Sequence, residues 1–174
     1  MHVMWLEGGF GSNLPPTISG RGVMRVEVSE GTVIDAKAET VYRILADYRV
    51  SHPAILPRRY FGPLTVERGG VGAGTVIAFE VRLGGPARRV RAEITEPEPG
   101  RRLVETDLDR GSVTTFEVAP ATGAGPRASV TIRTAWDTSG LRGLVERLLA
   151  PPMLRRVYRE ELANLAAAAV AAER

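Results

Sequence analysis

Hydrophobic residues follow two different periods along the chain, and the change of period predicts the order of the elements. The segment 23–34 alternates apolar and polar side chains, which predicts a first strand, with a bulge at Gly31. Helical spacing then begins at Ala38 and runs to Tyr48. Pro53 and Pro57 interrupt the segment after this helix, so we expect a second short helix or a loop there.

The middle of the chain predicts six more strands, with no helix between them. They are expected at 61–68, 75–83, 89–96, 102–107, 112–118 and 128–137. Short turns rich in glycine, proline and aspartate join them, which is typical of hairpins. Because parallel strands need crossover helices, this spacing predicts an antiparallel sheet.

One long helix is predicted to end the chain, with Thr138 or Ser139 as its N-cap. It carries two apolar stripes, comprising Leu141, Leu144, Val145 and Leu148, then Leu154, Val157, Tyr158, Leu162 and Leu165. Pro151 and Pro152 lie between the stripes and predict a kink, which would bend the helix over a curved sheet. Such a sheet could close around a cavity. The expected fold class is therefore α+β, with seven antiparallel strands around a kinked C-terminal helix.

Length and glycine content divide the chain into a tail and one domain. Residues 1–23 contain several glycines and prolines and predict a flexible N-terminal tail, a tag remnant or an upstream start. Residues 24–174 are expected to form a single domain, because 174 residues with 44% hydrophobic content suit one core.

Charge and cysteine content exclude several classes of function. The net charge is only +3, and the arginines are interleaved with acidic residues, so we expect no nucleic-acid binding. The absence of cysteine excludes disulfides and thiolate chemistry and fits a cytoplasmic protein. No apolar run reaches the roughly 20 residues of a membrane span. The sequence leaves open whether the chain forms a homodimer.

The order of elements and several short motifs resemble a known superfamily. The motifs are Val33-Ile34-Asp35-Ala36, Leu45-Ala46-Asp47-Tyr48, His52-Pro53, Gly72-Ala73-Gly74-Thr75, the run 95–105, Trp136-Asp137, and the proline-broken run 148–152. Together they resemble the START-like, helix-grip (SRPBCC) superfamily. More narrowly, the chain is similar to polyketide cyclase/dehydrase and lipid-transport proteins over residues 26–170. The resemblance implies a ligand cavity between the curled sheet and the last helix, and it carries over no catalytic residue.

Two motifs that could suggest other chemistry have simpler interpretations. The glycine run 69–74 lacks phosphate-loop spacing and precedes a strand, so it predicts a hairpin turn. His52 is the only histidine outside the tail, so neither a metal site nor a catalytic triad is expected. His52 is either an exposed loop residue or a polar contact and proton donor at the cavity mouth.

Glu105 is the other candidate for acid–base chemistry. If Leu103 and Glu105 face inward, the carboxyl group lies in an apolar cavity and its pKa would rise, which suits a general acid or base. If Val104 and Thr106 face inward, Glu105 is solvated, and the pattern leaves this register open. In the neighbouring strands, Arg82 and Arg91 are expected to point outward.

Aromatic residues complete the candidate site. The predicted ligand-binding residues are Tyr48, His52, Phe79, Glu105, Phe116, Trp136 and Tyr158. A buried tyrosine hydroxyl needs a hydrogen-bond partner, and a ligand oxygen can supply one.

The predicted function is therefore binding of a hydrophobic small molecule, such as an aromatic polyketide, a quinone or a lipid. As an enzyme the protein would cyclise or dehydrate it, without a cofactor or metal. The alternatives are a non-enzymatic lipid carrier and a partner-binding, chaperone-like module. Two or more ionisable groups facing the cavity would favour the enzyme, and an exposed apolar patch on the last helix would favour partner binding.

Overall fold

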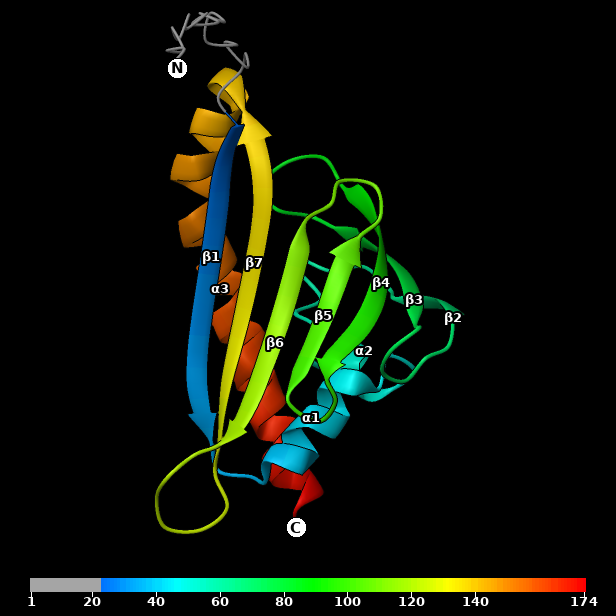
Figure 1. Cartoon of the computed structure of the whole chain (residues 1–174), viewed down its shortest axis with the longest axis vertical. Coiled ribbons are helices and arrows are strands. Elements are labelled where there is room, and N and C mark those ends of the chain that lie inside the picture. The colour runs from blue at the N-terminus through cyan, green and yellow to red at the C-terminus, as the bar shows by residue number, and fades with distance from the viewer. Residues whose placement is uncertain (1–22) are drawn as a thin grey trace, which may run out of the picture.

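A computed structural model describes residues 23–174, apart from the side chains at 141–146. Seven strands form one antiparallel sheet in the order β1-β7-β6-β5-β4-β3-β2, and three helices accompany it (Figure 1). The strands are β1 (Val23–Ile34), β2 (Thr65–Arg68), β3 (Val76–Val81), β4 (Arg88–Glu98), β5 (Arg102–Asp107), β6 (Val113–Pro120) and β7 (Ala128–Ser139). The helices are α1 (Ala38–Ala46), α2 (Ser51–Ile55) and α3 (Gly140–Ala172). The predicted fold class is confirmed.

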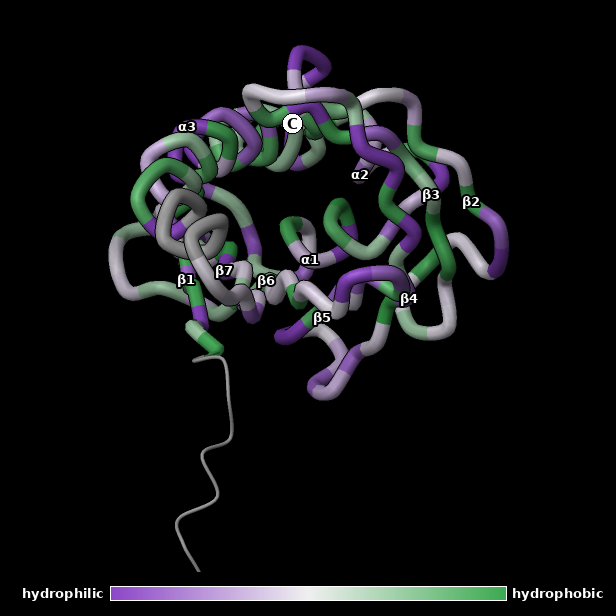
Figure 2. Tube along the Cα trace, turned by 90° about the horizontal axis from the view of Figure 1, so that it is seen from above, coloured by the Kyte–Doolittle hydropathy of each residue, from purple (hydrophilic) through white to green (hydrophobic). Residues whose placement is uncertain are grey.

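The sheet is open, because β1 and β2 are its two edges and do not pair with each other. The expectation that the strands close around a cavity is therefore wrong in this detail. Instead, the sheet curls, and the helices cover its concave side, as the view from above shows (Figure 2). Helix α3 contacts β1 and β7 as well as α1 and α2, so it links the long edge of the sheet to the short helices.

Strand β1 corrects one detail of the sequence analysis. Its pairing with β7 runs without a shift from Val23 to Ile34, so Gly31 lies in regular register opposite Thr131 and forms no bulge. The register shifts instead in β2, between Val66 and Arg68, and between Thr95 and Glu98 of β4. The predicted tail lies outside the described residues, except for Val23, which belongs to β1.

Helix α3 continues through Pro151 and Pro152, as the prediction of one helix requires. Figure 1 shows it running behind β1 and β7 and ending beside α1. The second stripe packs into the core, with Val157, Tyr158, Leu162 and Leu165 buried. The expectation that the first stripe also packs against the sheet is wrong at Leu148, which is 67% exposed. The other members of that stripe lie at 141–146, where the side chains are outside the described residues.

The core lies between the concave face of the sheet and the helices. Alternating residues of β4 and β5 point into it, including Val90, Ala92, Ile94 and Leu103. Arg82 and Arg91 are exposed, as predicted, and Arg91 pairs with Glu67 across the outer face. The alternation of the strands therefore decides which side chains can reach a cavity on the concave side.

Candidate functional site

A cavity of about 130 Å³ lies between the concave face of the sheet, α2 and α3. This volume is the space open to the centres of water molecules. Since one water needs roughly 10–15 Å³ by that measure, the cavity has room for a small organic molecule. Its lining is mainly apolar and includes Phe79, Val90, Phe116 and Ile132 from four strands. The cavity therefore combines size and hydrophobicity in a way that suits an apolar ligand.

Strand β5 directs a carboxyl group into this cavity. Leu103 is fully buried and Glu105 lines the cavity, so the inward face of β5 is the one that carries Glu105. The side chain of Glu105 is 13% exposed. The register that the sequence left open is thereby decided.

Helix α2 places His52 beside Glu105. His52 is buried and lines the cavity, so the alternative of an exposed loop histidine is wrong. Its Nδ1 lies 2.7 Å from the carbonyl oxygen of Leu45, which can only accept, so Nδ1 carries a hydrogen. Its Nε2 lies 3.7 Å from Glu105 Oε1, beyond hydrogen-bond distance. The ring stacks on Tyr48 and meets Phe116 edge-on.

The start of α2 is held by Asp47, just before it. Asp47 accepts hydrogen bonds from the backbone N–H groups of Arg49, Val50 and Ser51 and from the Ser51 hydroxyl. Burial alone would raise the pKa of Asp47, but these hydrogen bonds outweigh it and lower the pKa. The ionised carboxylate thus fixes the turn that orients His52.

Tyr48 supports the site from behind. It is fully buried, and its hydroxyl donates to Glu105 Oε1 at 2.6 Å. Burial, and then the negative charge of Glu105, raise the pKa of Tyr48 well above its ordinary value. Tyr48 therefore keeps its proton and remains a hydrogen-bond donor to Glu105. It contacts Glu105 but does not itself line the cavity.

A second buried carboxyl group, Glu161, faces the same cavity from α3. Its Oε1 is buried without a hydrogen-bond partner among the described residues. Burial, followed by the charge of Glu105, raises the pKa of Glu161 to about 8. The sequence analysis missed this residue. Its position three residues after Tyr158 and seven after Leu154 places it on the inner stripe of α3, and that was the available signal.

Tyr158 lines the cavity, but its hydroxyl is already engaged. It donates to Thr134 Oγ1 at 2.6 Å, and Thr134 in turn shares a hydrogen bond with Thr114. Burial raises the pKa of Tyr158, so the hydroxyl stays protonated. The partner that a ligand oxygen was expected to supply is thus provided by Thr134.

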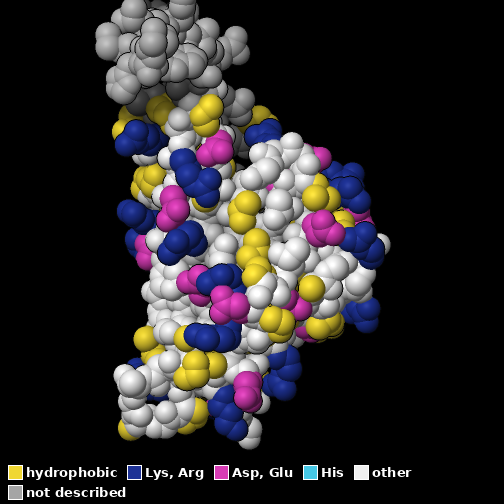
Figure 3. All heavy atoms as spheres, viewed as in Figure 1, with side chains coloured by type: hydrophobic (Ala, Val, Ile, Leu, Met, Phe, Trp, Pro, Cys, Tyr) yellow, Lys and Arg dark blue, Asp and Glu magenta, His cyan; other side chains and the backbone are white. Residues whose placement is uncertain are grey.

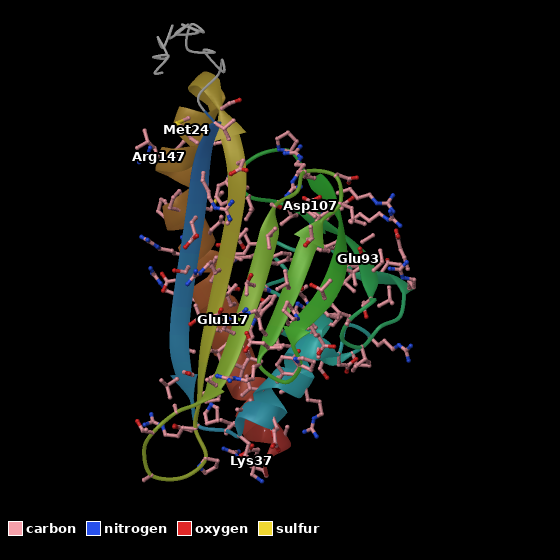
Figure 4. All side chains as sticks on the ribbon, in the orientation of Figure 1. Met24, Lys37, Glu93, Asp107, Glu117 and Arg147 are labelled. Atoms are coloured by element: carbon pink, nitrogen blue, oxygen red, sulfur yellow. The ribbon has the colours of Figure 1, made fainter. Side chains whose placement is uncertain are left out.

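An ion pair between Arg88 and Asp107 also lines the cavity. The two side chains meet at 2.9 Å, and Figure 4 shows Asp107 at the end of β5 nearest the following turn. Burial alone would raise the pKa of Asp107, but the hydrogen bond from Arg88 and those from backbone N–H groups lower it. Both charges are therefore satisfied within the protein.

Trp136 does not line the cavity, unlike Phe79, Phe116 and Tyr158. It follows Thr134 on the same face of β7, but it lies further along the strand, opposite Val26 of the edge strand. The cavity ends before this point. The structure brings five of the predicted residues to the cavity wall, namely His52, Phe79, Glu105, Phe116 and Tyr158.

The outer surface shows charges of both signs in alternation. In Figure 3, Lys and Arg side chains lie among Asp and Glu side chains over the sheet, and pairs such as Arg102 with Glu117 join neighbouring strands. The absence of nucleic-acid binding stays a prediction. Among the side chains that the structure describes, which exclude those at 141–146, no group of His, Asp and Glu is arranged to hold a metal ion. No described helix is both long and apolar enough to cross a membrane.

Comparison with known proteins assigns the fold and the family. The model of the family described as "Polyketide cyclase / dehydrase and lipid transport" matches residues 25–170. The solution structure of KanY protein (ms6282) is similar, with 31% identity, a TM-score of 0.71, and coverage of 82% of this chain and 96% of that one. No curated protein matches the chain at a significant level.

Two more distant structures share the fold. A START superfamily protein from Mycobacterium smegmatis has 16% identity and a TM-score of 0.55, covering 86% of this chain and 94% of its own. A norcoclaurine synthase mutant from Thalictrum flavumn, in complex with a transition-state analogue, has 12% identity and a TM-score of 0.65, covering 88% and 99%. With a family match over nearly the whole described region, this chain belongs to the polyketide cyclase/dehydrase and lipid-transport family.

Proposed function

We propose that the protein binds a hydrophobic small molecule in the cavity and transfers protons to and from it, cyclising or dehydrating it. The observation that carries this proposal is that three ionisable groups, His52, Glu105 and Glu161, line one apolar cavity. A carrier needs no such groups, and burying them is costly unless they serve a purpose. An aromatic polyketide, a quinone and a lipid are the candidate ligand classes.

Glu105 and Glu161 are suited to opposite roles in proton transfer. Glu161 has a pKa of about 8 and keeps its proton at neutral pH, so it serves as the acid. Glu105 carries the negative charge that raises that pKa, so it serves as the base. Two carboxyl groups in different protonation states are what a paired acid and base require.

Dehydration of a β-hydroxy ketone illustrates the step. Glu105 removes a proton from the carbon between the carbonyl and the hydroxyl-bearing carbon, and a carbon–carbon double bond forms. The carbon–oxygen bond breaks as Glu161 gives its proton to the departing hydroxyl, which leaves as water. A proton then passes from Glu105 back to Glu161, directly or through water, and resets the site.

Cyclisation uses the same base. Glu105 removes a proton from the carbon between two carbonyl groups, and the resulting enolate carbon attacks another carbonyl of the same chain. A carbon–carbon bond forms, the carbonyl double bond becomes a single bond, and its oxygen takes the proton of Glu161. The walls formed by Phe79 and Phe116 hold the chain folded, so that orientation supplies most of the rate. The complex of a norcoclaurine synthase with a transition-state analogue supports the view that this fold can host catalysis.

Native mass spectrometry of the protein purified from its source cells tests the binding proposal. We expect an adduct of small mass in the wild type, and its loss in Ala92→Phe, because Ala92 lines the cavity and a phenyl ring would fill it. Ala124→Phe, in the exposed loop between β6 and β7, is the matched control and should keep the adduct. An adduct that survives Ala92→Phe would contradict binding in this cavity.

Once the adduct is identified, a substitution at Glu105 separates an enzyme from a carrier. The enzyme proposal predicts that wild-type protein converts the linear or hydroxylated precursor, while Glu105→Gln binds it and leaves it unchanged. A carrier would release the same molecule from both proteins.

A partner-binding role is the second candidate, because α3 exposes two neighbouring leucines. Leu148 and Leu149 are 67% and 65% exposed. Exposed large apolar side chains at adjacent positions can mark a contact with another protein. Sedimentation of the wild type and of Leu148→Gln/Leu149→Gln over a range of concentrations checks for self-association through this surface.

A further inference from the structure

Three hydrogen-bond donors in and beside the cavity are already paired within the protein, while two carboxyl oxygens are not. The Tyr48 hydroxyl donates to Glu105, and the Tyr158 hydroxyl donates to Thr134. His52 Nδ1 donates to the Leu45 carbonyl. Among the described residues, Glu105 receives one hydrogen bond, at Oε1, which leaves Oε2 without one. Glu161 Oε1 has no partner within the same part of the chain. The protein has thus paired these three donors internally and left carboxyl oxygens of Glu105 and Glu161 at the cavity.

We propose that Glu105 and Glu161 together recognise a hydroxyl group on the ligand and that the cavity rejects anionic ligands. This inference rests on the proposed function, because it names the polar group that the hydrophobic ligand brings into the cavity. The ligand class is a neutral, mainly apolar molecule of one or two rings that carries a hydroxyl.

A hydroxyl group has the hydrogen-bonding capacity to pair with both carboxyl groups, because it is a donor and an acceptor. Its hydrogen can be donated to the charged Glu105, and its oxygen can accept the proton that Glu161 holds. A hydrogen bond to a charged group is among the stronger ones, so this contact favours the hydroxyl over other neutral groups. The ligand would thereby satisfy the buried Oε1 of Glu161 and the unpaired Oε2 of Glu105.

The other candidate groups fit less well. A quinone carbonyl can only accept, so it could pair with Glu161 but would leave the charge of Glu105 desolvated. A carboxylate, as in a fatty acid, would bring a further negative charge beside Glu105. Arg88 offers no compensation, because it is paired with the buried Asp107. Of the three candidate classes, hydroxylated aromatic polyketides and neutral hydroxylated lipids remain.

Naphthalene and three of its derivatives test the proposal, because they share one two-ring carbon skeleton and differ in their polar groups. Binding of naphthol, naphthoquinone, naphthoate and naphthalene to the full-length protein is measured by fluorescence or calorimetry at neutral pH. We expect naphthol to bind about tenfold tighter than naphthoquinone, and naphthoate to bind most weakly. Equal affinity for the four compounds, or tighter binding of naphthoate, would overturn the proposal while leaving hydrophobic ligand binding intact.

The variant Glu105→Gln supplies the second readout. An amide removes the charge that a quinone carbonyl would leave desolvated and adds an N–H donor, so the preference should move several-fold from naphthol toward naphthoquinone. Glu117→Gln, on the exposed face of β6, is the control and should change neither affinity. An unchanged preference in Glu105→Gln would contradict recognition by Glu105. If no derivative binds, naphthalene included, the binding proposal itself fails, and this inference fails with it.

Discussion

At the residue scale, Glu161 is the side chain on which the proposed proton transfer and ligand recognition depend most. It is buried beside the cavity with one oxygen unpartnered among the described residues, and the charge of Glu105 adds to the cost of ionising it. Burying such a group lowers the free energy of unfolding, and groups with strongly shifted pKa values cluster at functional sites. It is also the best probe of the site, because its protonation state links stability, pH and ligand binding.

The raised pKa of Glu161 predicts how stability changes with pH. In the unfolded chain its pKa is about 4.5, and in the folded protein it is about 8. The folded protein therefore holds the extra proton between these values. The stabilisation from this proton is complete below about pH 4.5 and is lost as the pH rises through 8, by an amount on the order of 5 kcal/mol.

Denaturant unfolding at several pH values between about 5 and 9 measures this effect. Glu161→Gln cannot ionise, so its free energy of unfolding should fall much less over that range, and it should exceed the wild type at the alkaline end. Glu117→Gln should keep the wild-type slope. The same slope in wild type and Glu161→Gln would show that Glu161 does not titrate in this range.

The hydrogen bond from Tyr48 to Glu105 predicts a coupling between two substitutions. Tyr48→Phe removes the donor and leaves the carboxylate less satisfied, so the free energy of unfolding should fall by about 1–3 kcal/mol. In the Glu105→Gln background, Tyr48→Phe should lower the free energy of unfolding by a smaller amount. A double-mutant cycle on unfolding free energies gives the difference, expected at about 0.5–3 kcal/mol, and additive effects would argue against the contact.

Sequence reasoning found some of these residues and missed others for a physical reason. Glu105 and His52 were named because their chemistry is rare in an apolar setting, but the sequence left open whether each faced the cavity. Those orientations depend on the pairing of β5 and on the turn that Asp47 holds. Glu161 was missed because a glutamate in a helix is usually solvated, and only its place on the stripe indicated burial.

At the element scale, the glycine-rich turn between β2 and β3 positions the site. The backbone N–H of Tyr48 donates to the Gly70 carbonyl, and Gly72 N–H donates to the carbonyl of Ala46 at the end of α1. Gly70 has a φ of +124°, and a Cβ there would overlap the Arg49 side chain. The turn therefore needs glycine in order to approach the segment that carries Tyr48 and His52.

Gly70→Ala should destabilise the protein by about 1–3 kcal/mol and weaken ligand binding, because the strained turn shifts the Tyr48 backbone. Gly85→Ala is the matched control, since Gly85 is not in the left-handed region and nothing lies within 4 Å of an added Cβ. Thermal unfolding and naphthol binding measure both effects. A Gly70→Ala protein that matches Gly85→Ala in both would exclude this role for the turn.

The elements themselves follow closely from the hydrophobic period. The limits of β1 and β5 agree with the predicted strands, because residues that favour turns or helices bound each run. The expectation that the first stripe of α3 is buried is wrong at Leu148, which is exposed. A helical period shows which residues share a face of the helix, but it does not show whether another element covers that face. Nor does the period show that the sheet stays open, since that depends on strand curvature.

At the scale of the whole molecule, the curled open sheet and the long helix divide the protein into two regions. The stretch of α3 from Leu154 to Glu161 closes the cavity, while Leu148 and Leu149, before it, are exposed. Ligand binding should therefore be independent of the exposed leucines. This separation allows the cavity and the surface to be tested one at a time.

Leu148→Gln/Leu149→Gln should leave the free energy of unfolding within about 0.5 kcal/mol of the wild type, because neither side chain is in the core. Naphthol affinity should also be unchanged. Calorimetric titration and denaturant unfolding check both points. A large loss of affinity would show that this part of α3 contributes to the cavity and that the two regions are not separate.

The central claim is that the cavity holds a hydrophobic ligand whose polar group meets Glu105 and Glu161. A crystal structure of the protein with naphthol tests it most directly. We expect the rings between Phe79 and Phe116, with the hydroxyl oxygen at hydrogen-bond distance, roughly 2.5–3.0 Å, from oxygen atoms of both carboxyl groups. A cavity collapsed onto its own side chains, or naphthol bound only on the outer surface, would contradict the account.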